Sequence, residues 1–214
     1  MTGRMYLVRK GAELPKHAAI VLGLGQEQFV FEDTRYFGRF TLDCQALEEL
    51  GPEPLEDTFT VDGFAVALKR STQSIKVKLL DQSLVAGIGN IYASEALFRA
   101  GISPRVSARR LKAVQIEKLW HCIREVLTEA IECGSTVPLN YSGTGERNGL
   151  FYFGRLTETS GHYEERLRVY DRAGEPCLNC GTKIKRLVQA ARSTFFCPSC
   201  QGGAHLSLQF RMRS

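Results

Sequence analysis

Runs of hydrophobic residues divide the chain into a β-rich beginning, a helical middle and an irregular end. Short β-branched or aromatic runs, separated by glycine and polar residues, predict four strands within residues 1–41. The expected strands are Met5–Val8, Ala19–Leu24, Gln28–Phe31 and Tyr36–Phe40. A four-stranded layer that starts at the first residue would expose an edge or a core face. We therefore expect only part of a β-sandwich here.

The middle of the chain carries apolar residues at helical spacing and predicts five helices. The expected helices are Leu42–Leu50, Phe64–Arg70, Ile75–Leu80, Asn90–Ala100 and 113–132. In the last of these a continuous apolar stripe is the clearest helical signal. Asn90 is expected to cap the fourth helix and Gly101 to end it. Strands followed by helices indicate an α+β protein.

Charge and hydropathy narrow the class of protein. No apolar run approaches the roughly 18 residues of a membrane span, and the first residues do not resemble a signal peptide, so we expect a cytoplasmic protein. The net charge is +5, and residues 166–214 hold nine basic against two acidic residues. Such a positive region can attract nucleic acid. Charge alone is equally compatible with a solvated surface.

Four of the seven cysteines form two C-x2-C pairs separated by sixteen residues. This spacing predicts a tetrahedral, structural Zn2+ site, in preference to two free pairs or a redox motif. The four expected ligands are Cys177, Cys180, Cys197 and Cys200. The remaining three cysteines, which we expect to be buried small hydrophobic residues, are Cys44, Cys122 and Cys133.

The segment between the two cysteine pairs is basic and contains no acidic residue. Its four basic residues are Lys183, Lys185, Arg186 and Arg192. A metal-bound hairpin with only positive charge suits insertion into a DNA groove or contact with phosphates. A zinc ribbon that binds another protein is the alternative.

A glycine-rich turn lies between two of the predicted helices. Gly87 and Gly89 would let the backbone approach a ligand closely, and the helix that starts at Asn90 presents free N–H groups that suit a phosphate. A bare G-x-G is usually only a turn, but its position between two helices strengthens the phosphate-binding interpretation.

Four motifs in one order give a specific family resemblance. GIGNIYASEALFRAGI, which follows IKVKLLDQ, resembles the helix–two-turn–helix signature of the formamidopyrimidine-DNA glycosylase and endonuclease VIII family. GEPCLNCGTKI with ARSTFFCPSCQ resembles the zinc finger of that family, and DTRYFG and LGPEPL match it too. The segments GNIYASE and RSTFFC resemble the formamidopyrimidine branch of this family more than the endonuclease VIII branch.

The resemblance implies a DNA-binding site. It implies that Asn90 and Lys76 bind phosphates beside the lesion, and that Arg192 grips phosphates at the flipped nucleotide and assists the second elimination. Three residues would fill the gap left by the flipped base and wedge the duplex, namely Met1, Arg35 and Phe37. His17 matches a DNA-contacting histidine. Ser71 departs from the family, which usually has a lysine nearby; Lys69 and Arg70 are possible substitutes.

The resemblance also implies base-excision repair of oxidised purines, such as 8-oxoguanine and formamidopyrimidines, by a glycosylase that is also an AP lyase. The family's nucleophile is an N-terminal proline beside a glutamate, whereas this sequence starts Met1, Thr2, Gly3 and has its first proline at Pro15. We therefore expect an N-terminally truncated chain that binds DNA without excising bases. A misassigned start or a broken gene is favoured over a real short product.

The full expectation is an α+β protein in successive parts: 1–41, part of the catalytic β-sandwich; 42–135, the helix–two-turn–helix domain; 136–165, a lesion-covering loop or linker; 166–203, the zinc finger; and 204–214, a tail. We expect a monomer with one structural Zn2+, associated with the bacterial nucleoid through double-stranded DNA containing oxidised bases or abasic sites. The alternatives are a non-catalytic damaged-DNA-binding module and a zinc-ribbon interaction protein without a role on DNA.

Overall fold

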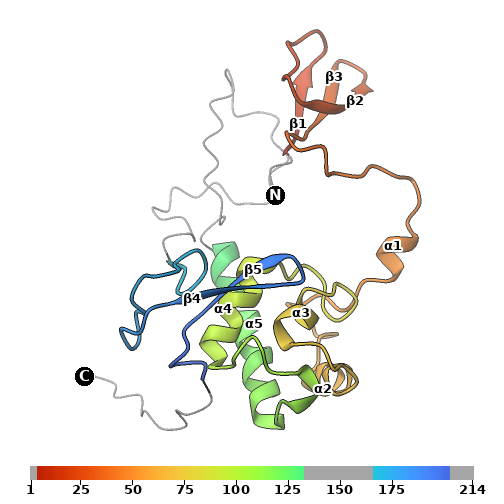
Figure 1. Ribbon diagram of the computed structural model, residues 1–214. Helices are drawn as coiled ribbons and strands as arrows, with labels where there is room; N and C mark the ends of the chain where they lie inside the picture. Colours follow the sequence, from red (N-terminus) through yellow and green to blue (C-terminus); the bar gives the residue numbers. More distant parts are fainter. Residues whose placement is uncertain (1–3, 133–165, 203–214) are drawn as a thin grey trace. The chain divides into compact units, whose positions relative to one another are not determined.

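The computed structural model describes residues 4–132 and 166–202 of the 214-residue chain (Figure 1). These residues belong to two compact units that divide between Cys44 and Gln45, and each unit is described by itself. The first unit contains the β-rich beginning of the chain. The second contains all the described helices from Gln45 onward together with the cysteine-rich hairpin.

The first unit is an antiparallel three-stranded sheet with strand order β1-β3-β2 (Figure 1). Its strands are β1 (Arg4–Arg9), β2 (Ala18–Leu24) and β3 (Glu27–Glu32). Tyr6 lies opposite Val30 in the β1–β3 register, and both side chains are buried. The first three predicted strands are therefore confirmed.

The fourth predicted strand, Tyr36–Phe40, is wrong, because this segment forms a turn without strand pairing. The buried Asp33 carboxylate accepts the backbone N–H groups of Arg35 at 3.1 Å and Gly38 at 2.7 Å. Tyr36 has a φ of +53°, a left-handed conformation that an extended strand cannot include. The side chain of Asp33 thus takes the amides that a strand would offer to a neighbour.

The second unit contains five α-helices and a short 3-10 helix within its described residues. Their bounds are α1 (Gln45–Glu48), α2 (Val61–Lys69), α3 (Ile75–Leu79), α4 (Asn90–Ala100), η1 (Ala108–Arg110) and α5 (Ala113–Glu132). The five predicted helices are present, with two differences in length. α2 begins earlier than predicted because the Thr60 hydroxyl caps it by accepting Gly63 N–H. α1 is only four residues long, since exposed Leu42 and Leu47 give it no packing support.

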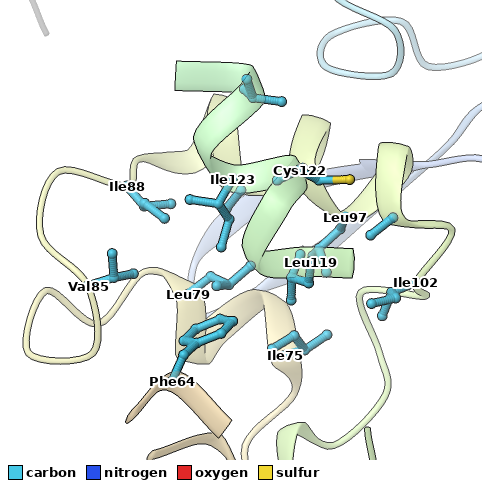
Figure 2. Packing of buried hydrophobic residues seen from close by; sticks show 14 of the residues in the cluster. Phe64, Ile75, Leu79, Val85, Ile88, Leu97, Ile102, Leu119, Cys122 and Ile123 are labelled. Atoms are coloured by element: carbon cyan, nitrogen blue, oxygen red, sulfur yellow. The ribbon is translucent and has the colours of Figure 1, made fainter. Parts of the chain in front are cut away.

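The helices of the second unit enclose one hydrophobic core (Figure 2). The apolar stripe of α5 provides Ile116, Leu119 and Ile123, which pack with residues of α2, α3 and α4. Further buried members of this core are Phe64, Leu68, Ile75, Leu79, Leu97 and Ile102. The stripe continues to the buried Ala130 near the end of α5, whereas Ile131 beside it is exposed. This core fixes the orientation of α3 and α4, the two helices that flank the glycine-rich turn.

Both ends of α4 are set by glycine. Gly101 follows the helix with a φ of +72°, the left-handed C-cap conformation expected from the sequence. At the other end the predicted cap is wrong: Gly89 is the N-cap, and Asn90 is the first helical residue. The Asn90 side chain does not cap the helix because it bonds to groups on two other elements, which are described below.

The cysteine-rich hairpin packs on α4 through a second, smaller core. Its strands β4 (Lys185–Gln189) and β5 (Arg192–Phe196) are antiparallel. The buried members of this core are Phe98, Val169, Cys177, Ile184, Phe195 and Cys197. The buried Glu95 carboxylate of α4 accepts the N–H groups of Arg168, Val169 and Tyr170, each at 2.9 Å. These bonds hold the segment before the hairpin against α4.

Within the described residues, no helix is long and apolar enough to cross a membrane.

Candidate metal centre and nucleic-acid interface

The four predicted metal ligands lie together. The sulfur atoms of Cys177, Cys180, Cys197 and Cys200 all lie within 4.8 Å of one another. The Sγ atoms of Cys177 and Cys200 are 3.9 Å apart, and those of Cys180 and Cys197 are 3.5 Å apart. Zn–S bonds of about 2.3 Å in a tetrahedron place sulfur atoms roughly 3.8 Å apart. The cluster therefore fits one Zn2+ ion with four thiolate ligands and no open position.

The backbone around the cluster shapes it for a metal. Gly181, with a φ of +73°, donates its N–H to the Cys177 carbonyl at 2.8 Å and closes the first turn. The second turn is held by Gln201, whose side chain accepts Cys197 N–H and donates to the Ile102 carbonyl. Burial raises the pKa of the Cys197 and Cys200 thiols, whereas a hydrogen bond with Thr182 lowers the pKa of Cys180 to about 6. A bound cation favours the ionised thiolate form of its ligands.

The other cysteines differ from one another. Cys122 is buried in the helical core as expected, and burial raises the pKa of its thiol to about 11, which leaves it protonated and inert. Cys44 is exposed, so its predicted burial is wrong. It lies beyond the sheet, in the segment that leads to α1, where no described core covers it. Cys133 lies outside the described residues.

The glycine-rich turn before α4 is held from behind by two residues that sequence reasoning did not single out. The Gln82 side chain accepts Gly87 N–H at 2.9 Å and donates to the Ile88 carbonyl at 3.1 Å, so one amide spans the turn. Gly51 approaches so closely that a Cβ there would lie 2.6 Å from the Ser83 carbonyl oxygen. The LGPEPL motif therefore provides backing for this turn, and its glycine is required by that close contact.

A part-buried chain of hydrogen bonds joins α3, α4 and the hairpin. Lys76 of α3 is fully buried and donates through Nζ to Asn90 Oδ1 at 2.5 Å. Asn90 in turn donates through Nδ2 to the backbone carbonyl of Ser193 in β5 at 2.8 Å. The two predicted phosphate-binding residues therefore contact each other, and Asn90 connects them to the hairpin beside Arg192.

Two cationic side chains, Lys76 and Arg192, determine the electrostatic potential around these hydrogen bonds. Arg192 is the exposed residue next to Ser193 at the start of β5. Burial, and to a lesser extent the charge of Arg192, lower the pKa of Lys76 to about 8. An anion bound near these two groups would relieve their repulsion and raise that pKa again. The arrangement is thus prepared for a negatively charged ligand.

The remaining basic residues of this region have separate surroundings. Arg186 donates through Nε to the Ser193 hydroxyl at 3.0 Å, across the hairpin from β4 to β5. Lys185 and Lys183 are both exposed. At the departure from the family pattern near Ser71, Lys69 donates its ammonium to the Leu111 carbonyl at 2.6 Å and so supports backbone. Arg70 is exposed beside it.

The predicted wedge residues lie in the first unit, on the turn held by Asp33. The pKa of the Asp33 carboxyl is lowered chiefly by the hydrogen bond from Gly38 N–H. Phe37 is 76% exposed, and the Arg35 guanidinium lies 4.7 Å from the centre of its ring. The half-buried His17 ring lies near Tyr36 in an edge-on arrangement, 6.1 Å between centroids. Met1 lies outside the described residues.

The structure thus groups the predicted site residues into three sets. The metal ligands form one cluster, Lys76, Asn90 and Arg192 lie along the α3–α4–hairpin junction, and His17, Arg35 and Phe37 belong to the other unit. Sequence reasoning missed the residues that support the second set, which are Gly51, Gln82, Glu95 and Gln189. Gly51, Gln82 and Glu95 lie inside the quoted motifs, and this position was the only sign of their role in the sequence.

Comparison with known families finds two matching domains. The description "Formamidopyrimidine-DNA glycosylase H2TH domain" matches residues 50–140, and "Zinc finger found in FPG and IleRS" matches residues 174–202. The first range includes α2 to α5 with the glycine-rich turn, and the second includes all four cysteines of the metal cluster.

Similar proteins extend the match beyond these two domains. A formamidopyrimidine-DNA glycosylase from Desulfitobacterium hafniense is 44% identical over 209 residues, which is 94% of this chain and 72% of the relative. One from Solibacter usitatus is 42% identical over 204 residues, covering 94% of this chain and 71% of the relative. The solved structure of the Fpg protein from Thermus thermophilus has a TM-score of 0.75 at 39% identity, covering 94% and 73% of the two chains. The Lactococcus lactis Fpg bound to DNA with an abasic site has a TM-score of 0.74 at 32% identity, covering 93% and 71%.

Proposed function

Because this chain belongs to the formamidopyrimidine-DNA glycosylase family, we propose that it binds double-stranded DNA carrying oxidised purines or abasic sites and acts in base-excision repair. The zinc finger holds one structural Zn2+. We further propose that the protein is a monomer that works on DNA in the bacterial cytoplasm.

One observation carries the proposed DNA contact: the Lys76–Asn90–Ser193 chain couples the helix–two-turn–helix segment to the zinc hairpin. The amide of Asn90, the N-terminal end of α4 and the exposed Arg192 belong to this one junction. Helix N-termini and arginine are both suited to phosphate oxygens. In this proposal the phosphates beside the lesion occupy that junction, and buried Lys76 acts through its charge and through Asn90.

A second part of the proposal concerns the space left by a flipped base. Glycosylases must take the target base out of the stack, and a planar or apolar side chain must fill the gap. Phe37 is exposed on a turn that two hydrogen bonds to Asp33 hold, and Arg35 stacks on its ring, so this pair suits insertion into the duplex. Met1 and His17 complete the proposed contacts of the first unit, with Met1 as the third gap-filling residue.

The proposed reaction is removal of the oxidised base followed by strand cleavage. In the family an N-terminal proline attacks the sugar as a secondary amine, and the resulting Schiff base leads to elimination, a form of covalent catalysis. The 214 residues contain no such Pro-Glu end. Pro15 lies inside the chain, so its nitrogen belongs to a peptide bond and cannot act as a secondary amine. We propose that these residues supply DNA binding, with Arg192 assisting elimination, and that excision needs the catalytic end.

Borohydride trapping on an 8-oxoguanine duplex tests this division of roles. The 214-residue chain is compared with a chimera that carries the N-terminal segment of the Desulfitobacterium relative. Both should retard the duplex in a binding assay, and only the chimera should form a covalent adduct after reduction. An adduct with the 214-residue chain would mean that another amine does the chemistry.

The second candidate function is a non-catalytic damaged-DNA-binding module, which would use the same metal cluster and the same Lys76–Asn90–Ser193 chain. It predicts tight binding of the damaged duplex by the 214-residue chain and no adduct with the chimera either. Equal weak binding to damaged and undamaged DNA, without dependence on Arg192, would contradict both candidate functions.

A further inference from the structure

Two alanines, Ala190 and Ala191, form the turn of the zinc hairpin, and alanine is unusual in a turn of this conformation. Gln189 pairs with Arg192, and the two residues between them, Ala190 and Ala191, have φ values of +46° and +58°. A two-residue hairpin turn with both φ values positive normally carries Asn-Gly or a similar pair. A residue with a Cβ is disfavoured in this conformation, so surrounding contacts must hold the turn.

On the β4 side, the Gln189 side chain supplies such a contact. Its Nε2 donates to the Ser74 hydroxyl at 2.9 Å and to the Pro104 carbonyl at 3.2 Å. Since a carbonyl can only accept, the contact with Pro104 fixes which end of the amide is the NH2 group. The hairpin is thereby tethered to the start of α3 and to the loop after α4.

The Gln189 side chain also leaves one of its hydrogen-bonding atoms unpaired. Gln189 Oε1 is buried without a hydrogen-bond partner in the described part of the chain. A buried, unpaired acceptor opposes folding. The tether is therefore not the arrangement that stability alone would favour, and an apolar side chain of similar length would remove the unpaired atom.

On the β5 side, a separate contact fixes the next residue. The Ser193 carbonyl accepts from Asn90 Nδ2 at 2.8 Å, and its hydroxyl accepts from Arg186 Nε at 3.0 Å. Only Ala190, Ala191 and Arg192 lie between this anchor and the Gln189 tether. The exposed Arg192 thus leaves the hairpin from a short segment that is held at both ends.

We propose that Gln189 is a positioning residue, which holds the Ala190–Ala191 turn in its strained form and so directs Arg192 toward a DNA phosphate. This inference rests on the proposed function, because it requires that Arg192 contacts DNA. Gln189 itself has no contact with the nucleic acid in this proposal. Its effect on binding passes through Arg192 alone.

The experiment measures the dissociation constant for a duplex with a tetrahydrofuran abasic-site analogue. Gln189→Met removes both donated bonds and the unpaired oxygen, and should weaken binding by roughly three- to tenfold, as expected for one or two hydrogen bonds. Its zinc content and melting temperature should match the wild-type chain. Val188→Ala, at the neighbouring residue of the same strand, which is 65% exposed, is the matched control and should bind normally.

Two further variants separate positioning from a general defect. Replacing Ala190 by Asn and Ala191 by Gly favours the turn without the tether, so these changes should restore binding in the Gln189→Met background. In an Arg192→Ala background, Gln189→Met should cause no further loss.

Normal binding by Gln189→Met, loss of zinc in that variant, or an undiminished effect in the Arg192→Ala background would each overturn the inference. Failure of the proposed function has a different signature, because Arg192→Ala would then bind the duplex as well as the wild-type chain. In that case the positioning role is refuted as well.

Discussion

At the scale of single residues, the junction depends on a buried lysine that loses its charge as the pH rises through about 8. Lys76 is held in a buried position beside Asn90, and its pKa is lowered to about 8 by burial and by Arg192. Its usual value is 10.5. A nearby phosphate favours the charged form, so DNA binding and protonation of Lys76 are linked.

We expect DNA affinity to fall by roughly tenfold as pH rises from 7 to 9.5, because the free protein loses the Lys76 proton and binding must restore it. Titrations of a labelled duplex at constant ionic strength measure this. Lys76→Met, which keeps the length of the side chain without its charge, should bind more weakly and lose the dependence between pH 8 and 9.5. A wild-type affinity that is constant over this range would contradict the linkage.

The lowered pKa of Lys76 also affects folding stability, with a pH dependence opposite to that of DNA affinity. The unfolded chain holds the Lys76 proton up to a higher pH than the folded chain, so between about pH 8 and 10.5 this residue makes unfolding less favourable as pH rises. Above that window the contribution is constant. Stability and DNA affinity should therefore change in opposite directions over this range.

Glu95 is the residue on which attachment of the zinc hairpin to α4 most depends. Glu95→Gln places an NH2 group where one oxygen now accepts a backbone N–H, and it removes the charge from three hydrogen bonds. We expect a loss of about 2–4 kcal/mol in the free energy of unfolding, measured with urea. Glu125→Gln, on the exposed face of α5, is the control and should change stability by less than about 0.5 kcal/mol. A similar result for both variants would refute the role given to Glu95.

At the scale of elements, the glycine-rich turn and the LGPEPL segment behind it require glycine for two different reasons. Gly51→Ala would place a Cβ 2.6 Å from a backbone oxygen that cannot move freely, whereas at Gly89 no atom lies within 4 Å of an added Cβ. We expect Gly51→Ala to cost about 1–3 kcal/mol or more in the free energy of unfolding. Gly89→Ala should leave thermal unfolding almost unchanged but weaken DNA binding, because the N-cap then no longer admits a phosphate closely. Loss of stability in both variants alike would contradict this distinction.

The zinc finger is an element whose fold depends on its metal. We expect one zinc per chain by mass spectrometry, and none after Cys180→Ser or treatment with a strong chelator at mildly acidic pH, where protons compete for the thiolates. DNA affinity should fall with the metal, since the hairpin that presents Arg192 loses its support. Cys44→Ala, outside the cluster, should keep its zinc. Retention of full DNA affinity without zinc would show that the hairpin does not need the ion.

At the scale of the whole molecule, the excess of basic residues in the last 49 positions predicts a strong dependence of DNA binding on salt. The logarithm of the affinity should fall linearly with the logarithm of the salt concentration, and Arg192→Ala should reduce the slope by about 1. Salt-independent binding, or none, would instead support a zinc ribbon that interacts with another protein.

Much of the architecture could be predicted from the sequence because its signals are local. Three strands, the extents of α3, α4 and α5, and the metal cluster follow from periodicity, glycine and cysteine spacing. The failures have a common cause, which is competition by side chains for backbone groups. Asp33 replaces a fourth strand with a turn, and Asn90 bonds across the chain when a helix cap was expected.

The supports of the site were beyond prediction from the sequence because they join residues far apart along it. Asn90 and Ser193 are 103 positions apart, and Gln189 and Ser74 are 115 apart. No local period reports such pairs. A buried glutamate in α4 likewise gave no sign that its partners would be amides more than seventy positions later.

Those amides offer a built-in reporter for the motion of the hairpin. Glu95 protects three consecutive backbone N–H groups at positions 168 to 170, and these groups can exchange with heavy water only when the segment leaves α4. Their exchange rate therefore measures how often this segment and the hairpin that follows it separate from α4, and no label is needed. A ligand that grips helix and hairpin together would slow this exchange, whereas one that touches only the helix would leave it unchanged.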